Sequence, residues 1–212
     1  MNGRRTVSTD EKTEIQALER KYPTESMKPG KPERIEFEYI RHGTLSLIAS
    51  FDVVTGRILS PCIGGTRSEQ DFCEHIRQVI SGDPQANEWV FVADQLNIHK
   101  SESLVRLVDE LCGLEKELGV KGKSGILKSM ESRADFLKDK THSIRFLYTP
   151  KHCSWLNQIE IWFGILTKKL LKRGNFDSKE TLRDKLINFI EYFNKNIARP
   201  YRWTFDGLPL KA

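Results

Sequence analysis

Residues 154–163 read SWLNQIEIWF, and Glu160 is the one charged residue in this otherwise mostly apolar stretch. Carboxylates rarely lie beside a protein core unless they are paired or bind a metal. If the stretch belongs to a helix running from Ser154 to about Lys172, its apolar side chains gather on one face. Glu160 then lies about 100° from the centre of that face. It is either an ordinary boundary residue or a functional group at the shoulder of a buried face. The apolar face is expected to comprise Trp155, Ile159, Trp162, Phe163, Leu166 and Leu170.

Composition sets broad limits on the function. The chain has 212 residues, with 34 Lys and Arg against 29 Asp and Glu, for a net charge of +5. This mild excess is compatible with a polyanionic partner but does not require one. No apolar run is long enough to cross a membrane, and the N-terminus lacks the apolar core of a secretory signal. The four cysteines form no C-x-x-C pair, which argues against a zinc ribbon and for reduced thiols in a cytosol.

The order of expected elements is that of an α/β domain. A short strand, Thr6–Asp10, precedes a polar turn that could be helical. Several antiparallel strands, a helix, a strand, a second helix, another strand and two further helices follow. The strands are expected at Thr6–Asp10, Ile35–Ile40, Thr44–Val53, Arg57–Ile63, Glu88–Ala93 and Ile144–Thr149. The helices are expected after the capping-box sequence Ser68–Asp71, over Leu104–Leu114, from Ser154, and from Asp177 or Ser178.

Residues 113–143 are polar, basic and poorly periodic, so we expect an inserted excursion at the surface. The tripeptide Gly122-Lys123-Ser124 suggests a phosphate-binding loop. That motif needs a glycine five positions before Gly122, where this chain has Glu117. The sequence therefore argues against a nucleotide-binding loop.

Two further carboxylates are candidates for chemistry. Asp94 follows the apolar strand Glu88–Ala93, at the end where ligands of open α/β sheets bind. Asp10 ends the short strand Thr6–Asp10, although it could equally be the N-cap of a following helix. Each acid taken alone is a common loop or capping residue. They indicate a site only if the fold brings them together with Glu160.

Several segments resemble one known family. FVADQLNIHKSESL (91–104), LYTPKHCSWLNQIEIWF (147–163) and LLKRGNFDSKETL (170–182) are similar to the catalytic domain of bacterial insertion-sequence transposases. These enzymes are the DDE transposases of the mariner-like superfamily. TVSTDEKTEIQALERKYP (6–23), FEYIRHGTLSLIASFDVVTG (37–56) and PYRWTFDG (200–207) resemble the same family. The likeness covers nearly the whole chain, 1–212, and SWLNQIE is its most specific part.

The resemblance implies a ribonuclease-H-like mixed sheet flanked by helices, with an acidic triad. Matched to the family motifs, the triad is Asp10, Asp94 and Glu160. In the family these acids hold two Mg²⁺ ions, for which Mn²⁺ can substitute. Glu11 is expected on the opposite strand face and outside the triad.

Polar and basic residues flank these acids in the sequence. Asn97, His99 and Asn157, with His152 and Ser154, are candidates for orienting the ligands, although loop and helix capping explains them equally well. The basic run Lys168, Lys169, Lys172 and Arg173 is either a solvated helix face or a contact for DNA phosphates. Both interpretations stay open at this stage.

The function implied by the resemblance is a metal-dependent DNA transposase, cutting at transposon ends and joining them to target DNA. A homodimer on DNA and a cytoplasmic, nucleoid-associated location would follow. Relatives carry an N-terminal helix-turn-helix domain, yet the first acid here is already residue 10. We therefore expect this domain to be absent or supplied by a separate protein or upstream reading frame. The alternatives are a catalytically silent DNA-binding or dimerisation remnant and a generic ribonuclease-H-like nuclease.

Overall fold

A five-stranded mixed sheet forms the centre of the computed structural model, which describes residues 3–34 and 36–201. The strand order is β3-β2-β1-β4-β5. β1 (Arg4–Arg20) pairs antiparallel with β2 (Tyr39–Asp52), which pairs antiparallel with β3 (Ile58–Gly64). On its other side, β1 pairs parallel with β4 (Glu88–Ala93), and β4 pairs parallel with β5 (Ile144–Tyr148). This arrangement confirms the expected mixed sheet.

β1 is much longer than expected. Instead of ending at Asp10 before a helical turn, the strand continues to Arg20 against β2. The charged sequence of residues 11–20 has weak strand propensity, but the ladder with β2 outweighs it. A register shift between Lys12 and Ile15 accommodates Glu14, whose φ of 55° interrupts regular pairing. The alternative in which Asp10 caps a helix is therefore wrong.

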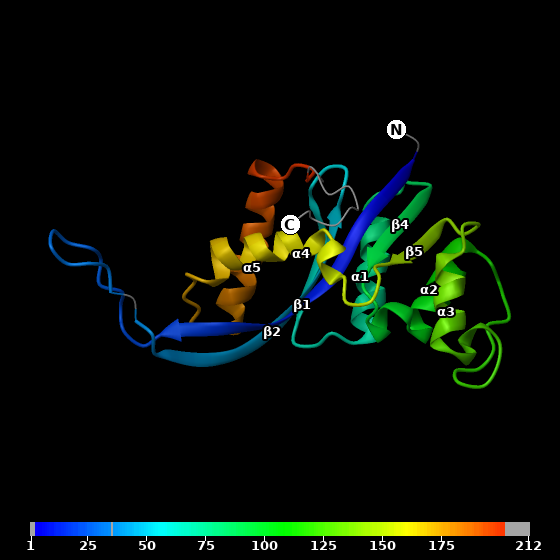
Figure 1. The fold of residues 1–212 in the computed structure, drawn as a ribbon, viewed down its shortest axis with the longest axis horizontal. Helices are drawn as coiled ribbons and strands as arrows, with labels where there is room; N and C mark the ends of the chain where they lie inside the picture. Colours follow the sequence, from blue (N-terminus) through cyan, green and yellow to red (C-terminus); the bar gives the residue numbers. More distant parts are fainter. Residues whose placement is uncertain (1–2, 35, 202–212) are drawn as a thin grey trace, which may run out of the picture.

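The far ends of β1 and β2, with the segment that joins them, form an arm that projects from the body of the domain (Figure 1). In the strand expected at Ile35–Ile40, the described residues 36–38 are not in a strand. β2 begins at Tyr39 and continues unbroken through the second expected strand. Its positions from Leu45 to Asp52 are buried, whereas its first positions lie exposed in the arm. The sheet therefore joins the domain core to an exposed extension.

Helices cover both faces of the sheet. On one face, α1 (Glu69–Ser81), α2 (Glu102–Cys112) and α3 (Met130–Lys138) pack with β4 and β5 around one apolar cluster. On the other face, α4 (Ile159–Leu166) and α5 (Lys179–Asn196) pack against β1 and β2. The strand expected at Glu88–Ala93 is confirmed. Ser68 and Ser178 cap the N-termini of α1 and α5, at the helix starts that the sequence predicts. No described helix is long and apolar enough to span a membrane.

The segment 113–143 is only partly a surface excursion, because residues 119–125 are exposed while its second half packs into the core. It contains a short 3-10 turn, Ile126–Lys128, followed by α3. Leu127 and Leu137 are fully buried among residues of β4, β5 and α2. Spaced apolar residues in a polar segment do not produce strong periodicity, which is why the sequence did not reveal them. That the segment is an insertion relative to the family stays a prediction.

The helix that carries Glu160 begins later than expected. Ser154–Leu156 is a 3-10 turn, Asn157 has extended backbone angles, and α4 starts at Ile159. Trp155, expected on the buried face, is therefore 55% exposed. The helix passes into a π-helical turn at Thr167–Leu171. Of the C-terminal family match at 200–207, only the first two residues are among those described.

Candidate active site

The parallel register of β1 and β4 sets Asp10 and Asp94 level with each other. Ser8 pairs with Val92 in the ladder, so Asp10 and Asp94 each lie two residues beyond this pair. β4 ends at Ala93, which leaves Asp94 free of the ladder at the carboxyl end of the strand. Ligands bind at such strand ends in open α/β sheets. The sheet itself therefore brings together two of the three expected acids.

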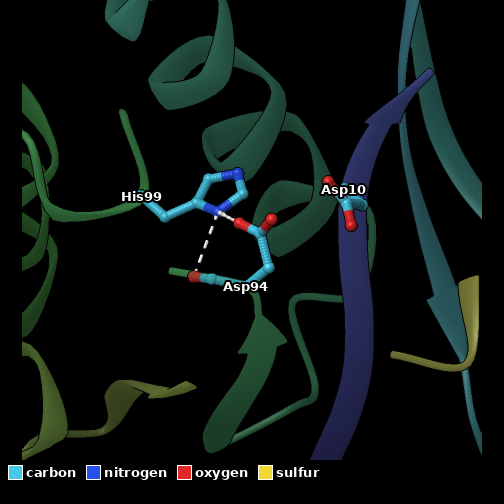
Figure 2. Close-up of side chains that lie close together, drawn as sticks. All are labelled: Asp10, Asp94 and His99. Atoms are coloured by element: carbon cyan, nitrogen blue, oxygen red, sulfur yellow. Dashed lines mark hydrogen bonds and ion pairs between the residues drawn. The ribbon is translucent and has the colours of Figure 1, made fainter. Parts of the chain in front are cut away.

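Asp10, Asp94 and His99 form a compact cluster (Figure 2). One ligand atom from each residue lies within 4.8 Å of those from the other two. The Nδ1 atom of His99 lies 2.9 Å from Oδ1 of Asp94. His99 belongs to the 3-10 turn η1 (Asn97–Lys100), which directly follows the Asp94 loop, and its side chain is fully buried. The expectation that His99 orients an acid is thus consistent with its contacts.

Burial and charge give the two aspartates opposite pKa shifts. Burial, together with the charge of Asp94, raises the pKa of Asp10 to about 7. Burial also acts to raise the pKa of Asp94, but hydrogen bonds from His99 and the Leu96 amide outweigh it and leave this pKa below its usual value. At neutral pH and without a cation, the Asp10 carboxyl is therefore protonated in a fraction of the molecules.

Glu11 also belongs to the site. Its Oε1 atom lies 2.9 Å from Nε2 of His99, and its side chain is almost fully buried. Burial acts to lower the pKa of His99, but the hydrogen bonds and charges of Asp94 and Glu11 raise it to about 10. At neutral pH His99 is consequently an imidazolium ion that donates from both ring nitrogens. This contact cannot be read from the sequence, because neighbouring residues of a strand point to opposite faces and Glu11 has no local signal for His99 as its partner.

Asn157 fixes the start of α4 against β1. Its Nδ2 donates to the Thr9 carbonyl at 3.0 Å and to Oδ2 of Asp10 at 3.2 Å. Its Oδ1 accepts a hydrogen bond from Ser8, whose Oγ in turn accepts from the amide of Ile159 at 2.8 Å. These bonds hold Asn157 extended and explain why the helix begins only after it. They also support the expectation that Asn157 orients an acid, here Asp10.

Glu160 lies in the first turn of α4, next to the Asn157 anchor, and its amide donates to the Asn157 carbonyl at 3.1 Å. Its carboxylate does not belong to the compact cluster of Asp10, Asp94 and His99. It is nevertheless close enough to interact with Asp94. Burial raises the pKa of Glu160, the positive charge of Lys12 opposes this, and the negative charge of Asp94 adds to it. The fold therefore brings Asp10 and Asp94 together and places Glu160 at their margin.

The donor set fits a hard divalent cation. Carboxylate oxygens suit Mg²⁺ and Mn²⁺. A cation between Asp10 and Asp94 would offset the repulsion that raises the pKa of Asp10. His99 is a poor ligand, because both of its nitrogens already donate to carboxylates. The residues that could hold a metal are thus Asp10 and Asp94, with Glu160 available from the helix.

The remaining predicted residues lie outside this cluster. Asn97 is exposed at the start of η1, while His152 and Ser154 are exposed in the turn before α4. The basic residues Lys168, Lys169, Lys172 and Arg173 are all exposed, on and just after the π-helical turn. Their placement is compatible with solvent contact and with phosphate contact alike.

Comparisons with known proteins point to one family. The family model described as DDE superfamily endonuclease matches residues 5–183. No curated protein sequence matches the chain. Among solved structures, a pre-cleavage Mos1 transpososome is similar with a TM-score of 0.56 and 15% identity, covering 92% of this chain and 54% of that one. The Mos1 mariner paired-end complex with Mn gives a TM-score of 0.55 at 15% identity, over 88% of this chain and 48% of that one.

The isolated catalytic domain of Mos1 mariner transposase is also similar, with a TM-score of 0.51 and 12% identity over 90% of this chain and 77% of that domain. At such identities the likeness concerns the fold, which is ribonuclease-H-like. The chain spans about half the length of the transposase chains in the two complexes.

Proposed function

This chain belongs to the DDE superfamily of endonucleases, and from that premise we propose that it is the catalytic domain of a DNA transposase. The observation that carries the proposal is the meeting of Asp10 and Asp94 at one level of two parallel strands, with His99 fixed beside them. Two carboxylates that are forced together in a half-buried setting are what cation-dependent phosphodiester chemistry requires. The family match over residues 5–183 supports the same assignment.

We assign Asp10, Asp94 and Glu160 as the residues that would hold Mg²⁺ or Mn²⁺. The ions, when bound, would polarise the scissile phosphate and lower the pKa of an attacking water. Asn157 holds the Asp10 carboxylate through Oδ2, while the Glu11 amide donates to its other oxygen at 2.8 Å. His99 holds Asp94. Each of the two aspartates therefore has its orientation fixed by neighbours before a substrate arrives.

The proposed substrate is duplex DNA at the ends of a mobile element. The domain would cut this DNA and then join the freed 3′-hydroxyl to target DNA. The similar solved structures include a Mos1 transposase paired-end complex with a left transposon end and a Mos1 strand transfer complex, which supports DNA as the partner. A homodimer on DNA, and end recognition by a helix-turn-helix domain encoded elsewhere, complete the proposal. The exposed basic run from Lys168 to Arg173 is assigned to DNA backbone contact.

The test is a cleavage assay on duplex DNA that carries the element's own ends, with Mg²⁺, with Mn²⁺ and with EDTA, each with and without an added helix-turn-helix domain. We expect strand cleavage with either metal and none in EDTA. Asp94→Asn is the matched negative control. Intact DNA binding without cleavage under every condition would favour the catalytically silent remnant. Cleavage confined to RNA or RNA–DNA hybrids would favour the generic nuclease.

A further inference from the structure

A second polar site lies at the base of the arm, apart from the acidic cluster. Residues Arg20–Thr24 and the loop residues Arg173 and Asn175 enclose a pocket of about 420 Å³. We call it the arm-base pocket. Its lining residues come from the end of β1 and the residues just after it, and from the loop that follows the π-helical turn.

Hydrogen bonds fix the two walls of the pocket relative to each other. The Arg20 amide donates to Oδ1 of Asn175 at 2.6 Å, and the Phe176 amide donates to the Leu18 carbonyl at 2.8 Å. Lys185 of α5 donates from Nζ to the Asn175 carbonyl at 3.1 Å, which adds another cation behind the loop. The pocket is therefore a built feature of the fold rather than an accidental gap between loops.

The charged side chains that line the pocket are all basic, namely Arg20, Lys21 and Arg173. Nη1 of Arg20 donates to the Glu36 carbonyl at 2.6 Å, and its guanidinium lies 5.5 Å from the Tyr39 ring centre. These contacts orient the guanidinium without neutralising it. Within the described part of the chain, neither Arg20 nor Arg173 forms an ion pair with a carboxylate.

Lys21 does pair with Glu38 at 2.8 Å, but both side chains are about half exposed. Exposed pairs of this kind contribute little and exchange partners readily. The pocket at the other end of the sheet differs, because its Arg5 is paired with Asp52 and Asp83. Unpaired, oriented guanidinium groups suit phosphate oxygens, which they bind with two parallel hydrogen bonds.

We propose that the arm-base pocket binds a backbone phosphate of duplex DNA. The exposed run of Lys168, Lys169 and Lys172 leads along the chain directly to Arg173 in the pocket wall. This continuity favours an extended polyanion over a free phosphate ion. Phosphate contacts position a duplex without reading its sequence.

The length of the helix between Glu160 and the pocket gives an estimate of the spacing between the pocket and the acids. From Glu160 to Leu171 the helical axis rises roughly 17 Å at 1.5 Å per residue. That length corresponds to about five base pairs at 3.4 Å each. The contacted phosphate is thus expected about half a helical turn from the cleavage point. Both the phosphate contact and its spacing from the acids rest on the proposed function, in which this chain acts on DNA.

The experiment measures fluorescence anisotropy of a labelled duplex of about 30 base pairs with the full chain across a salt series. For the double variant Arg20→Gln/Arg173→Gln, we expect the dissociation constant to rise at least about fivefold near 0.1 M salt. The plot of log K against log salt should become shallower by roughly 1 to 2 units. Arg20→Gln removes a hydrogen bond within the arm, so Arg173→Gln alone is measured too, because the Arg173 side chain makes no hydrogen bond with the described residues. For Arg173→Gln alone, we expect about half of the change in the salt slope that the double variant shows.

The matched control is Arg77→Gln/Arg106→Gln, which removes the same charge from exposed arginines on α1 and α2. Wild-type affinity and slope in both pocket variants would overturn the inference, even if the chain cleaves DNA. Weakened binding in these variants would support it, even if no metal-dependent cleavage is found. Inorganic phosphate binding that Arg173→Gln abolishes, without any change in the DNA titration, would also overturn it.

Discussion

Nε2 of His99 lies 2.9 Å from Oε1 of Glu11, and both side chains are almost fully buried. The other ring nitrogen of His99 faces Asp94 at the same distance. One buried imidazolium ion thus links a β1 carboxylate to a candidate metal ligand just after the neighbouring strand β4. Buried charges require such pairing, because an unpaired one is costly.

We expect Glu11→Gln to lower the free energy of unfolding by about 3 kcal/mol, because it leaves His99 with one fewer counterion in a buried setting. It should also reduce cleavage about 10- to 100-fold through loss of the Asp94 orientation. Urea unfolding and cleavage kinetics measure the two effects. His99→Gln and the double variant complete a thermodynamic cycle. Additive effects on both stability and cleavage would show that the two residues are not coupled.

Asp94→Asn should preserve the fold and remove cleavage. The amide keeps the size of the side chain and can still accept from His99, but it withdraws the charge needed to hold a divalent cation. Circular dichroism should match the wild type, while the cleavage rate falls at least about 100-fold. Cleavage at the wild-type rate would move the chemistry to other residues.

Metal binding should stabilise the protein more at pH 8 than at pH 6. The pKa of Asp10 is raised to about 7, so the stability contributed by its proton is fully present below its unfolded value of 3.8 and is lost as pH rises through 7. A cation offsets this loss at pH 8, whereas it must displace the proton at pH 6. The measurement is the shift in Tm on adding Mg²⁺ or Mn²⁺ at each pH. Asp10→Asn is the control, and in it the shift should be small at both values.

The sequence predicted the fold best where local and tertiary signals agree. Glu88–Ala93 is apolar and central, and it forms a strand with those bounds. Ser68 has a capping sequence and caps a helix. The prediction for residues 11–20 was wrong, because pairing with the distant strand β2 outweighs their charged, helix-compatible composition. A single sequence contains no local signal for that pairing.

The same distinction applies to the site. Asp10 and Asp94 were identified through resemblance to a family, and the ladder register explains why they meet. Glu11 was missed because adjacent strand residues point to opposite faces, and only the placement of His99 shows its partner. Asn157 was recognised as a candidate, but its role in delaying the start of α4 depends on contacts with Ser8 that are 149 residues distant in the chain.

His75 should make the protein less stable in mild acid. It is fully buried between Ser60 and Ser50, with its ring nitrogens 2.9 Å from the Ser60 carbonyl and 2.8 Å from the Ser50 hydroxyl. Burial lowers its pKa to about 4. The unfolded chain therefore takes up a proton near pH 6.5 that the folded chain does not. Stability should fall as pH drops from 6.5 towards 4, by up to about 3 kcal/mol.

Urea unfolding at pH 7 and pH 4.5 measures this loss. His75→Gln should be less stable than the wild type at pH 7, because it loses part of the buried hydrogen bonding. Its stability should nevertheless change less between the two pH values. An equal pH dependence in the variant and the wild type would assign the acid sensitivity to carboxylates instead.

The lysines on and just after the π-helical turn, here called the basic turn, are candidates for DNA contact. Lys168 and Lys169 of the π-helical turn and Lys172 just after it are exposed. If they contact DNA phosphates, replacing all three with glutamine should weaken binding by a similar factor for every duplex sequence. It should also make the salt dependence shallower by up to about 3 units, because each lost phosphate contact removes close to one unit. The matched control replaces Lys121, Lys123 and Lys128, three exposed lysines in the segment 113–143. If the basic turn is only a solvated surface, both triple variants will give the wild-type titration at low and high salt. Tight discrimination of the element's ends by this chain alone would contradict the phosphate-contact assignment, because phosphate contacts carry no sequence information.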